Sequence, residues 1–385
     1  MFTKDENKLA TSVGRGTPGG ELLRRYWFPV AGISELTDEQ PTQFVRLLGE
    51  DLVLFRDKSG SVGLLADHCS HRGASLLYGR VEERGISCAY HGWLYDTKGD
   101  CLECPAEPAG SRFHLTVKQR AYPVEALFGL YWAYLGPAPT PPIRRLDVMQ
   151  YPIDYIRIET EFQANWVQVM ENNLDGSHIF VLHQETYVMH REEDGSQHRA
   201  TSTTRGLIDD LAELKYREVP AGIMRTIGVT DGYVEEDLLI FPNMLRRMNT
   251  LSIKAPTDDT HTKKYVVAVR TNPDADPVAR TNASSGYRST SSDAKTPIEA
   301  AYPDARYRMD KLPYQDMMAI ESQGRISPRE AWHLGTKDDG VAMLDRMILR
   351  EIDKVARGLE PLGAGEHARE IVDTNFDALH TVGLR

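Results

Sequence analysis

The fold is decided by two short stretches, Cys69-Ser70-His71-Arg72-Gly73 and Cys88-Ala89-Tyr90-His91-Gly92-Trp93, with sixteen residues between His71 and Cys88. Each stretch pairs one cysteine with one histidine, and both side chains bind metal ions in proteins. A glycine lies within two residues of each histidine, which lets the backbone turn tightly. The spacing therefore predicts two loops that fold around one metal centre.

Two thiolates and two imidazoles at this spacing predict a Rieske [2Fe–2S] cluster held by Cys69, His71, Cys88 and His91. Neutral imidazoles then replace two thiolates on one iron, which raises the reduction potential to roughly −150 to +300 mV. The alternative is a structural zinc site, which also accepts two cysteines and two histidines. Zinc sites usually pair Cys with Cys and His with His, whereas each pair here is mixed, so we favour the iron–sulfur cluster.

The segment that carries this motif resembles the N-terminal domain of the Rieske non-haem iron oxygenases. The resemblance extends over most of the chain. Within the family, the chain is similar to the phthalate and phenoxybenzoate dioxygenase branch. The resemblance is strongest in the cluster motif and in residues 16–27, 166–183, 241–243 and 256–262. The resemblance implies an α+β protein: an N-terminal all-β Rieske domain, then a catalytic domain with an antiparallel sheet and helices in a helix-grip (START-like) arrangement.

Length and charge set further limits. A chain of 385 residues is long enough for two domains with separate cores. The formal net charge of −11 argues against a nucleic-acid partner. The first residues contain no apolar leader segment, and no stretch reaches the ~18 apolar residues of a membrane span. We therefore expect a cytoplasmic protein with neither nucleic-acid nor membrane partners.

Only four cysteines are present, so no disulfide framework is expected. Cys101 and Cys104 form a CxxC motif outside the cluster motif. It is compatible with a redox pair or a second metal site, but one CxxC supplies only half of a metal site. We favour two reduced, partly packed thiols.

The Pro-rich segment 136–142 divides the chain into a domain of residues 1–140, with an N-terminal helical arm, and a catalytic domain of residues 141–385. The first domain is β-rich, with a hairpin at 44–55 and strands at 122–125 and 130–135. In the second, strands are expected at 155–159, 237–241, 251–254 and 265–269, and helices from 165 to about 183 and over 341–357. Residues 272–300 are polar and predict a mobile loop, placed over the mouth of the pocket.

A second metal site is indicated by His178 and His183, which follow Asp175 in the predicted helix. Five residues turn His183 about 140° from His178 on an ideal helix, so the helix is distorted or the side chains converge through different rotamers. Two histidines at the edge of a core would be the ordinary interpretation. We favour a metal site because an electron-carrying cluster needs an acceptor, and because the run resembles the mononuclear iron motif of the family.

Two imidazoles and one carboxylate make the facial triad of non-haem Fe(II) oxygenases. The resemblance implies that Asp316, in the pair Gln315-Asp316 that opens a C-terminal helix, is the third ligand, with Glu321 and Asp310 as alternatives. An acid in a first helical turn can also simply stabilise the helix.

Asp175 precedes His178 by three residues, so both face one side of a helix, and the carboxylate can orient the imidazole. The resemblance implies more. In the family's trimers the equivalent aspartate bridges a cluster histidine of one subunit to an iron histidine of the next, here His91 to His178. It therefore also implies a homotrimer or a multiple of one.

The function implied by the resemblance is that of a terminal oxygenase, which uses NAD(P)H-derived electrons and O₂ to hydroxylate a carboxylated aromatic substrate at Fe(II). The electrons come from a reductase with FMN and a plant-type [2Fe–2S] centre. Arg side chains bind carboxylates through a two-pronged fork, and the candidates are Arg205, Arg225, Arg246 and Arg247. Two alternatives remain: an O-demethylase or monooxygenase of a methoxylated aromatic acid, and a Rieske electron carrier without oxygenase activity.

Overall fold

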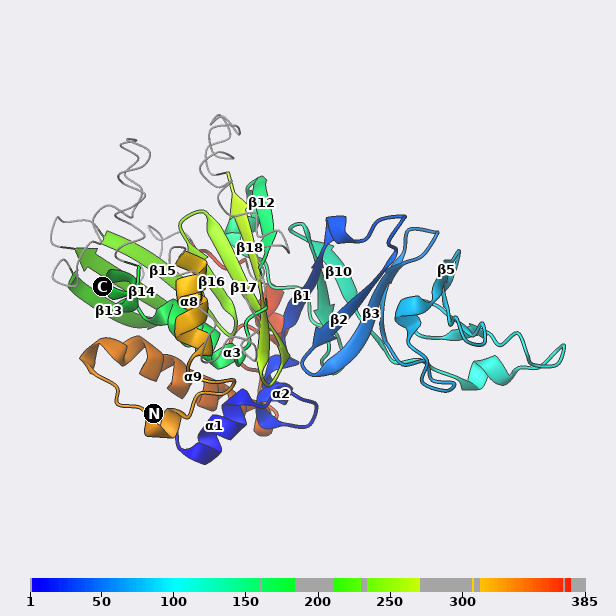
Figure 1. Cartoon of the computed structure of the whole chain (residues 1–385), viewed down its shortest axis with the longest axis horizontal. Coiled ribbons are helices and arrows are strands. Elements are labelled where there is room, and N and C mark those ends of the chain that lie inside the picture. The colour runs from blue at the N-terminus through cyan, green and yellow to red at the C-terminus, as the bar shows by residue number, and fades with distance from the viewer. Residues whose placement is uncertain are drawn as a thin grey trace.

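A computed structural model of the chain describes residues 2–159, 161–183, 211–229, 234–270, 307, 312–369 and 371–374. The molecule is elongated, with small β-sheets at one end and a large sheet with helices at the other (Figure 1). The whole of the predicted 272–300 loop lies outside the described residues, and so do Arg205 and Asp310.

Three antiparallel sheets form the first end of the molecule, in the strand orders β1-β11-β10, β2-β3-β4-β9 and β5-β6-β7-β8. The strands are β1 (Trp27–Gly32), β2 (Thr42–Leu47), β3 (Glu50–Arg56), β4 (Val62–Ala66), β5 (Arg80–Glu82), β6 (Gly85–Ser87), β7 (Leu94–Tyr95), β8 (Cys101–Glu103), β9 (Ala121–Tyr122), β10 (Val124–Leu127) and β11 (Leu130–Tyr134). The predicted hairpin at 44–55 is confirmed by the pairing of β2 with β3. Leu48 and Gly49 both have positive φ (50° and 75°), as a two-residue hairpin turn requires.

One seven-stranded antiparallel sheet dominates the other end, in the order β12-β18-β17-β16-β15-β14-β13. Its strands are β12 (Ile153–Ile158), β13 (Leu211–Val219), β14 (Gly222–Val229), β15 (Val234–Ile240), β16 (Met244–Arg247), β17 (Thr250–Asp258) and β18 (His261–Val269). The four strands predicted for this part of the chain are confirmed. From β13 to β18 the strands follow each other as a meander, and β12 adds beside β18.

The α-helices are α1 (Lys4–Thr11), α2 (Pro18–Leu23), α3 (Trp166–Leu174), α4 (His178–Val181), α8 (Leu312–Glu321) and α9 (Asp339–Ala356). Short 3-10 turns are η1 (Ile33–Glu35), η2 (Leu76–Tyr78), η3 (Phe113–Thr116), η4 (Asp147–Gln150), η8 (Arg329–Ala331), η9 (Thr336–Asp338) and η10 (Gly365–Arg369). The helix predicted at 341–357 is confirmed as α9. It packs against β13 and β14, and α3 packs against β17 and β18, so the sheet grips helices as the helix-grip prediction requires.

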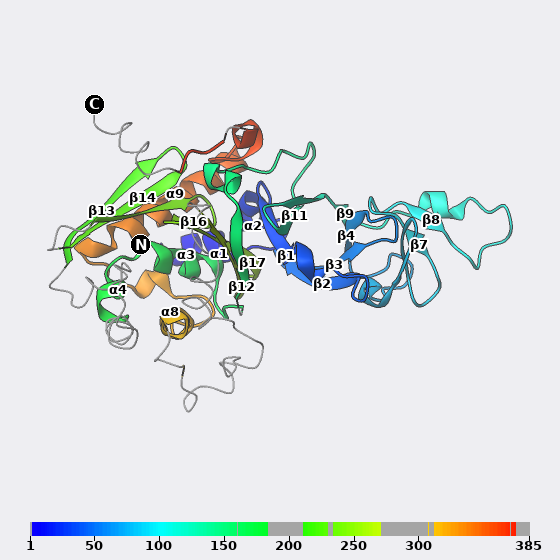
Figure 2. The ribbon, with the colours of Figure 1, turned by 90° about the horizontal axis from the view of Figure 1, so that it is seen from above.

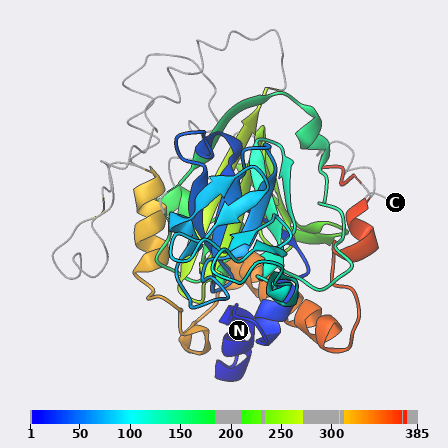
Figure 3. The ribbon, with the colours of Figure 1, turned by 90° about the vertical axis from the view of Figure 1, so that its right-hand side faces the viewer.

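Figure 3 views the molecule from the end that carries the small sheets. They lie in front of the seven-stranded sheet, with α1 and α9 below and α8 at one side. Among the described residues, no helix has both the length and the apolar character that crossing a bilayer demands.

The prediction of one continuous helix from 165 to about 183 is wrong. The helix ends at Leu174, Asp175 is extended with ψ 118°, and a new short helix begins at His178. The beginning agrees with the prediction, because Asn165 caps α3 by accepting a hydrogen bond from the Val167 N–H at 3.1 Å.

The two ends of the molecule are joined through backbone hydrogen bonds. At the β2–β3 turn, the Leu48 N–H donates to the Pro256 carbonyl at 2.9 Å, and the Gly49 N–H donates to that of Thr257 at 2.8 Å. The hairpin thus docks on the part of β17 that extends beyond β16.

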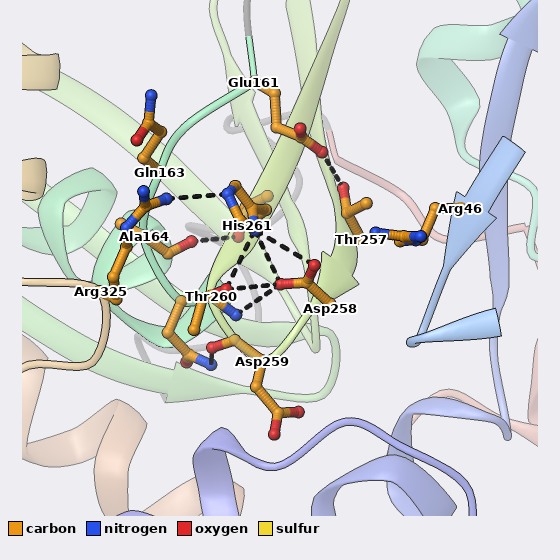
Figure 4. A network of polar contacts seen from close by, with 12 residues as sticks. Arg46, Glu161, Gln163, Ala164, Thr257, Asp258, Asp259, Thr260, His261 and Arg325 are labelled. Carbon is orange, nitrogen blue, oxygen red and sulfur yellow. Dashed lines mark hydrogen bonds and ion pairs between the residues drawn. The ribbon is translucent and has the colours of Figure 1, made fainter. Parts of the chain in front are cut away.

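The β17–β18 turn is a second fixed point (Figure 4). His261 donates through Nδ1 to Asp258 at 2.9 Å and accepts through Nε2 from Arg325 at 2.8 Å. Asn165 donates to the Asp259 carbonyl at 2.7 Å. The turn therefore ties the start of α3 to the segment that follows α8, and His261 has a structural role there.

Candidate metal centres and catalytic cavity

The two cysteine–histidine loops share one backbone design. In each, the cysteine N–H donates to the carbonyl five residues further on, at 2.9 Å. Its own carbonyl accepts from the glycine four residues further on, Gly73 (2.8 Å) or Gly92 (2.9 Å). Both glycines have φ above +70° (75° and 72°), a conformation in which an L side chain is strained. The sequence pattern of Cys followed by Gly at the fourth position therefore encodes the turn.

The side chains on these loops suit a cluster with two kinds of ligand. Cys69 and Cys88 are buried, with 3% and 2% exposure. The imidazoles of His71 and His91 are only partly buried, and their ring centroids lie 4.6 Å apart. His71 also stacks on Trp93 at 4.2 Å. Paired thiols inside and paired imidazoles toward solvent fit a [2Fe–2S] cluster whose histidine side faces electron-transfer partners.

Two further residues support this site, and sequence reasoning did not identify them. The Tyr95 hydroxyl lies 3.2 Å from Cys69 Sγ and 3.0 Å from Ser70 Oγ. Burial and the Cys69 thiol raise the pKa of Tyr95, so the hydroxyl keeps its proton and is able to donate to sulfur. Gln119 accepts from the Ser70 N–H at 2.8 Å and donates to the Ala66 and His68 carbonyls, which fixes the first loop.

The helix break at Asp175-Gly176-Ser177 precedes the second set of candidate metal-binding side chains and sets the direction of α4. Asp175 Oδ1 accepts from the N–H and the hydroxyl of Ser177, at 2.8 and 2.7 Å, which starts α4 in a new direction. A Cβ at Gly176 would lie 2.6 Å from Leu214 Cδ1, so glycine is what lets β13 approach this break.

His178, His183 and Asp316 converge on one point. Asp316 Oδ1 lies 3.5 Å from His178 Nε2 and 3.1 Å from His183 Nε2. Within the described part of the chain, this is the one group of three His, Cys, Asp or Glu residues whose ligand atoms all lie within 4.8 Å. Asp316 Oδ1 is buried between the two imidazoles, and a carboxylate oxygen in that place fits a bound cation. Two nitrogens and one oxygen are the donor set of a facial triad.

Of the two alternative carboxylates, Glu321 does not join this group, and Asp310 lies outside the described residues. Glu321 is buried at the far end of α8, where it accepts from the Gln163 N–H at 2.9 Å and from the Tyr307 hydroxyl at 2.7 Å.

Each histidine has an oxygen acceptor beside its other nitrogen, as a hydrogen bond at His183 and an ion-pair contact at His178. His183 Nδ1 lies 2.7 Å from Gln315 Oε1, and His178 Nδ1 lies 3.3 Å from Asp175 Oδ2. Because both partners are acceptors, Nδ1 carries the proton in each ring, which leaves Nε2 free to bind a metal. The pair Gln315-Asp316 thus provides one residue that orients an imidazole and one that faces the metal position.

The charges of this site are strongly coupled in the metal-free protein. Burial opposes ionisation of Asp316, but hydrogen bonds from His178 and His183 outweigh it and hold the pKa of Asp316 far below its ordinary range. Burial likewise opposes the charged form of His178, yet Asp175 and Asp316 raise the pKa of His178 to about 9. Two carboxylates therefore stabilise positive charge at this point, which a metal cation can supply in place of a proton.

Arg225 holds the backbone of the helix break. Its guanidinium is 2% exposed, forms an ion pair with the buried Asp237, and donates to the carbonyls of Asn173 and Asp175, both at 2.9 Å. These carbonyls are at the end of α3, where no helical N–H is available to them. Arg225 therefore acts as a cap for the helix whose end positions Asp175 and His178.

A cavity of about 210 Å³ opens beside the three converging side chains. Besides His178, His183 and Asp316, its lining includes Tyr155, Arg157, Asn172, Asn173, Ile179, Arg225, Leu245, Arg247, Thr250, Ser252, Lys264 and Val266. Of the four arginines predicted for substrate binding, Arg225 and Arg247 line the cavity, Arg246 is not among the lining residues, and Arg205 is outside the described residues.

Three basic residues near the cavity were missed by sequence reasoning. Arg157 and Lys264 line it, and Lys254 lies on the same sheet face as Ser252, because residues two apart in a strand share a face. Lys254 is fully buried and donates to Asn173 Oδ1 at 3.1 Å. Burial and the neighbouring Lys264 lower the pKa of Lys254 well below its ordinary value, which favours the neutral amine.

Comparison with known proteins identifies the family of the chain. Residues 26–123 match the family described as Rieske [2Fe-2S] domain. The oxygenase subunit of 5,5'-dehydrodivanillate O-demethylase from Sphingobium sp. strain SYK-6 is 33% identical over 379 residues, which cover 94% of this chain and 83% of that protein. The oxygenase subunit of phthalate 4,5-dioxygenase from Pseudomonas putida is 31% identical over 410 residues, covering 98% and 92%.

Among solved structures, the terminal oxygenase of carbazole 1,9a-dioxygenase from Nocardioides aromaticivorans IC177 has a TM-score of 0.62 at 18% identity, covering 90% of this chain and 96% of that one. This likeness shows a shared fold, and the sequence relatives show the family. The chain therefore belongs to the Rieske non-haem iron oxygenases, as an oxygenase subunit.

Proposed function

We propose that this oxygenase subunit uses O₂ and NAD(P)H-derived electrons to hydroxylate a carboxylated aromatic substrate. Its cofactors are a Rieske [2Fe–2S] cluster and a mononuclear iron. In this proposal Cys69, His71, Cys88 and His91 hold the cluster, and His178, His183 and Asp316 hold the iron. The convergence of the last three on one cavity is the observation that carries the proposal.

When bound, the iron supplies the oxygen chemistry and the cluster supplies single electrons. The protein's own side chains keep both imidazoles of the iron site in the tautomer with a free Nε2, through Asp175 and Gln315. Asp316 contributes one negative charge, and the cavity holds the aromatic ring next to the metal position.

The charge balance of the cavity supports an anionic substrate. Glu159 is the shared partner of Arg157 (2.7 Å) and Lys264 (2.9 Å), so two cations face one carboxylate. Arg225 and Arg247 instead share the two acids Asp237 and Glu235. The excess positive charge is therefore at Arg157 and Lys264. We propose that the substrate carboxylate binds there, with Arg247 at the opposite wall and Arg225 in its capping role.

Two sequence relatives have names that suggest probes. One is a phthalate 4,5-dioxygenase subunit and another is a phenoxybenzoate dioxygenase subunit, 31% identical over 389 residues. A screen of aromatic acids, with a reductase that carries FMN and a plant-type [2Fe–2S] centre, would follow oxygen uptake and identify products. A cis-diol supports ring dihydroxylation. Formaldehyde supports O-demethylation, the second candidate, which the 33% identity to a demethylase subunit favours.

Arg157→Gln tests the proposed carboxylate site. Losing a charged hydrogen-bonding partner costs about 1.5–3 kcal/mol, so KM for an aromatic acid should rise roughly 10- to 100-fold. KM for the methyl ester of that acid should change little. Arg84→Gln is the matched control, because Arg84 is exposed and pairs with Glu103 far from the cavity. Equal effects on acid and ester would contradict a carboxylate contact at Arg157.

An iron count separates the oxygenase from a simple electron carrier. A loaded chain with both sites holds three irons, whereas a carrier with the cluster alone holds two. His183→Ala should reduce the count to that of the cluster and abolish oxygenation, while the visible spectrum of the cluster stays. Unchanged iron content and turnover would disprove the triad.

We also propose that electrons pass between chains in a homotrimer or a multiple of one. The cluster loops and the α4–α8 site lie at opposite ends of the elongated chain, as Figures 1 and 2 both show. Asp175 is partly exposed (29% of its side chain) beside His178, so a neighbour's cluster histidine is able to approach it.

A further inference from the structure

Cys101 and Cys104 have no part in the oxygenase chemistry proposed above, yet they lie directly beside the cluster site. Cys101 is in β8, opposite Tyr95 of β7, whose hydroxyl contacts Cys69. Cys101 also packs in the same buried cluster of side chains as Cys69 and Cys88. The Sγ atoms of Cys101 and Cys104 are 3.6 Å apart, and both thiols are free.

The two thiols differ in their access to solvent. Cys101 is 4% exposed, and Cys104 is partly exposed at the end of the strand. Cys101 Sγ also lies 3.6 Å from the Glu103 carbonyl. Burial, together with hydrogen bonding to Cys104, raises the pKa of Cys101 to about 12, so it stays a thiol. A soluble oxidant therefore reaches Cys104 first and finds Cys101 in contact behind it.

A metal site is a poorer explanation for the pair. The CxxC motif supplies two ligands, and within the described residues no third His, Cys, Asp or Glu completes a group with them. The acid between them, Glu103, forms an ion pair with Arg84. Two thiols in contact without a third ligand favour redox chemistry over metal binding.

We propose that Cys101 and Cys104 form a reversible dithiol–disulfide pair that is oxidised by hydroperoxides. The Cys104 thiolate attacks one peroxide oxygen, the O–O bond breaks, and Cys104 becomes a sulfenic acid while hydroxide, or alkoxide from an organic peroxide, leaves. Cys101 sulfur then attacks the sulfenic sulfur, the S–O bond breaks, and water leaves with the Cys101 proton. In sum, two thiols lose two electrons and two protons, and hydrogen peroxide becomes two waters.

The geometry makes the second step local. An S–S bond is about 2.05 Å long, so the contacting sulfur atoms need to approach by only about 1.5 Å. Cys104 is followed by a turn in which the Glu107 N–H donates to its carbonyl, outside the cluster loops. The site therefore traps an oxidising equivalent beside the cluster without using a cluster ligand.

The experiment uses the cluster-loaded protein without substrate or oxygen. The protein is treated with a small excess of hydrogen peroxide. Its free thiols are then alkylated with iodoacetamide in a denaturant that contains a chelator. Peptide mass spectrometry should find a Cys101–Cys104 disulfide that dithiothreitol reverses, while the visible absorbance of the cluster before denaturation stays unchanged. Cys101→Ser should leave Cys104 as a sulfenic acid that dimedone traps. Cys104→Ser should slow oxidation of the remaining thiol by about tenfold or more.

Three outcomes would overturn the proposal. The first is that iodoacetamide still alkylates both thiols at peroxide concentrations that bleach the cluster. The second is a disulfide that joins Cys101 or Cys104 to Cys69 or Cys88, which would mark damage after cluster loss. The third is that Cys104 of the wild-type protein is oxidised to sulfinic acid and no disulfide forms. That result would show that Cys101 does not react with the sulfenic acid of Cys104.

Discussion

At the scale of single residues, Tyr95 is the side chain that reaches the cluster site most directly without being one of its proposed ligands. Its buried hydroxyl is positioned to donate to Cys69 Sγ at 3.2 Å. A hydrogen bond to a ligand sulfur withdraws electron density and stabilises the reduced, more negative cluster.

Tyr95→Phe should therefore lower the midpoint potential of the cluster. A hydrogen bond worth about 1–2 kcal/mol corresponds to a shift of roughly 40–80 mV for one electron. Redox titration followed by circular dichroism measures the shift. Ser70→Ala is the control, because it removes the neighbour of Tyr95 at 3.0 Å and keeps the donor to sulfur. An unchanged potential in a Tyr95→Phe protein with an intact spectrum would contradict the hydrogen bond.

Asp345 is a buried acid that the oxygenase chemistry does not use. It is 3% exposed on α9, and both carboxyl oxygens are buried beside the acid Glu171. Burial, reinforced by the charge of Glu171 on α3, raises the pKa of Asp345 to about 8. Glu171 itself is held by two hydrogen bonds from the fully buried Arg329, at 2.6 and 2.7 Å.

This pKa predicts a pH-dependent stability. Folded Asp345 keeps its proton up to about pH 8, whereas an unfolded aspartate releases it near pH 4. The folded state binds more protons between these values, so its stability falls as pH rises across that window. Asp345→Asn removes this loss, and the free energy of unfolding should exceed that of the wild type at pH 8 by roughly a few kcal/mol, and by less at pH 5.

Urea denaturation followed by far-ultraviolet circular dichroism measures the difference at the two pH values. Asp353→Asn, an exposed change on the same helix, should leave the wild-type pH dependence unchanged. Parallel pH dependences for Asp345→Asn and the wild type would show that Asp345 is ionised in the folded protein.

At the scale of elements, the break between α3 and α4 sets the direction of the short helix that begins at His178 of the proposed iron site. On one straight helix His178 and His183 would diverge by about 140°. In the structure α4 ends at Val181, before His183, and both Nε2 atoms lie within 3.5 Å of Asp316 Oδ1. Arg225 satisfies the two carbonyls that the break exposes, and Asp237 fixes Arg225 in turn.

Arg225→Lys should weaken iron binding while the cluster spectrum stays. Lysine keeps the positive charge beside Asp237 but lacks the planar fork that serves two carbonyls and a carboxylate together. Loss of such support typically costs 10- to 100-fold in metal affinity, about the effect expected here. Iron retained against a chelator is the measurement. Arg247→Lys is the matched control, because Arg247 lines the same cavity and pairs with Glu235 and Asp237, whereas the carbonyls of the break accept from Arg225. Equal retention in both variants would disprove the capping role.

Elements with local signals were the predictable part of the fold. The 44–55 hairpin follows from alternating apolar residues around a glycine turn, and α9 from the helical spacing of Met343, Leu344, Met347, Ile348 and Ile352. The Asp175-Gly176-Ser177 run is a local turn signal, but the packing and capping of the break depend on Leu214 and Arg225, which are distant in sequence. Arg157 and Lys264 were missed for a similar reason: only the register of β12 and β18 places them on the cavity face.

At the scale of the whole molecule, the chain separates its two metal sites. The sheets that carry the cluster loops form one end, and α4 and α8 lie at the other (Figures 1 and 2). The docking of the β2–β3 turn on β17 fixes this arrangement. An electron that enters at the His71–His91 surface therefore has a short route to iron only if another chain brings its iron site to that surface.

Asp175 is the residue through which that route is proposed to pass, and Asp175→Asn tests it. Asparagine keeps the size of the side chain and an oxygen for the Ser177 hydrogen bonds, so α4 and both metal centres should persist. It loses the charge that binds His178 Nδ1 and would bind a neighbour's His91. Burial opposes ionisation of Asp175, but the hydrogen bond from His178 lowers its pKa far below the ordinary range, so the wild-type residue is charged throughout the working pH range.

The measurement is single-turnover oxidation of a pre-reduced cluster in the presence of substrate and O₂. The rate should fall by orders of magnitude in Asp175→Asn, with iron content near that of the wild type. Ser177→Ala separates the two roles of Asp175, because it disturbs the turn and keeps the charge, and it should retain most of the rate. If Asp175→Asn oxidises its cluster at the wild-type rate, Asp175 only orients His178, and electrons cross between chains by another path. If the variant loses its iron instead, the negative charge of Asp175 is needed for iron binding itself, and the slower oxidation follows from the lost iron.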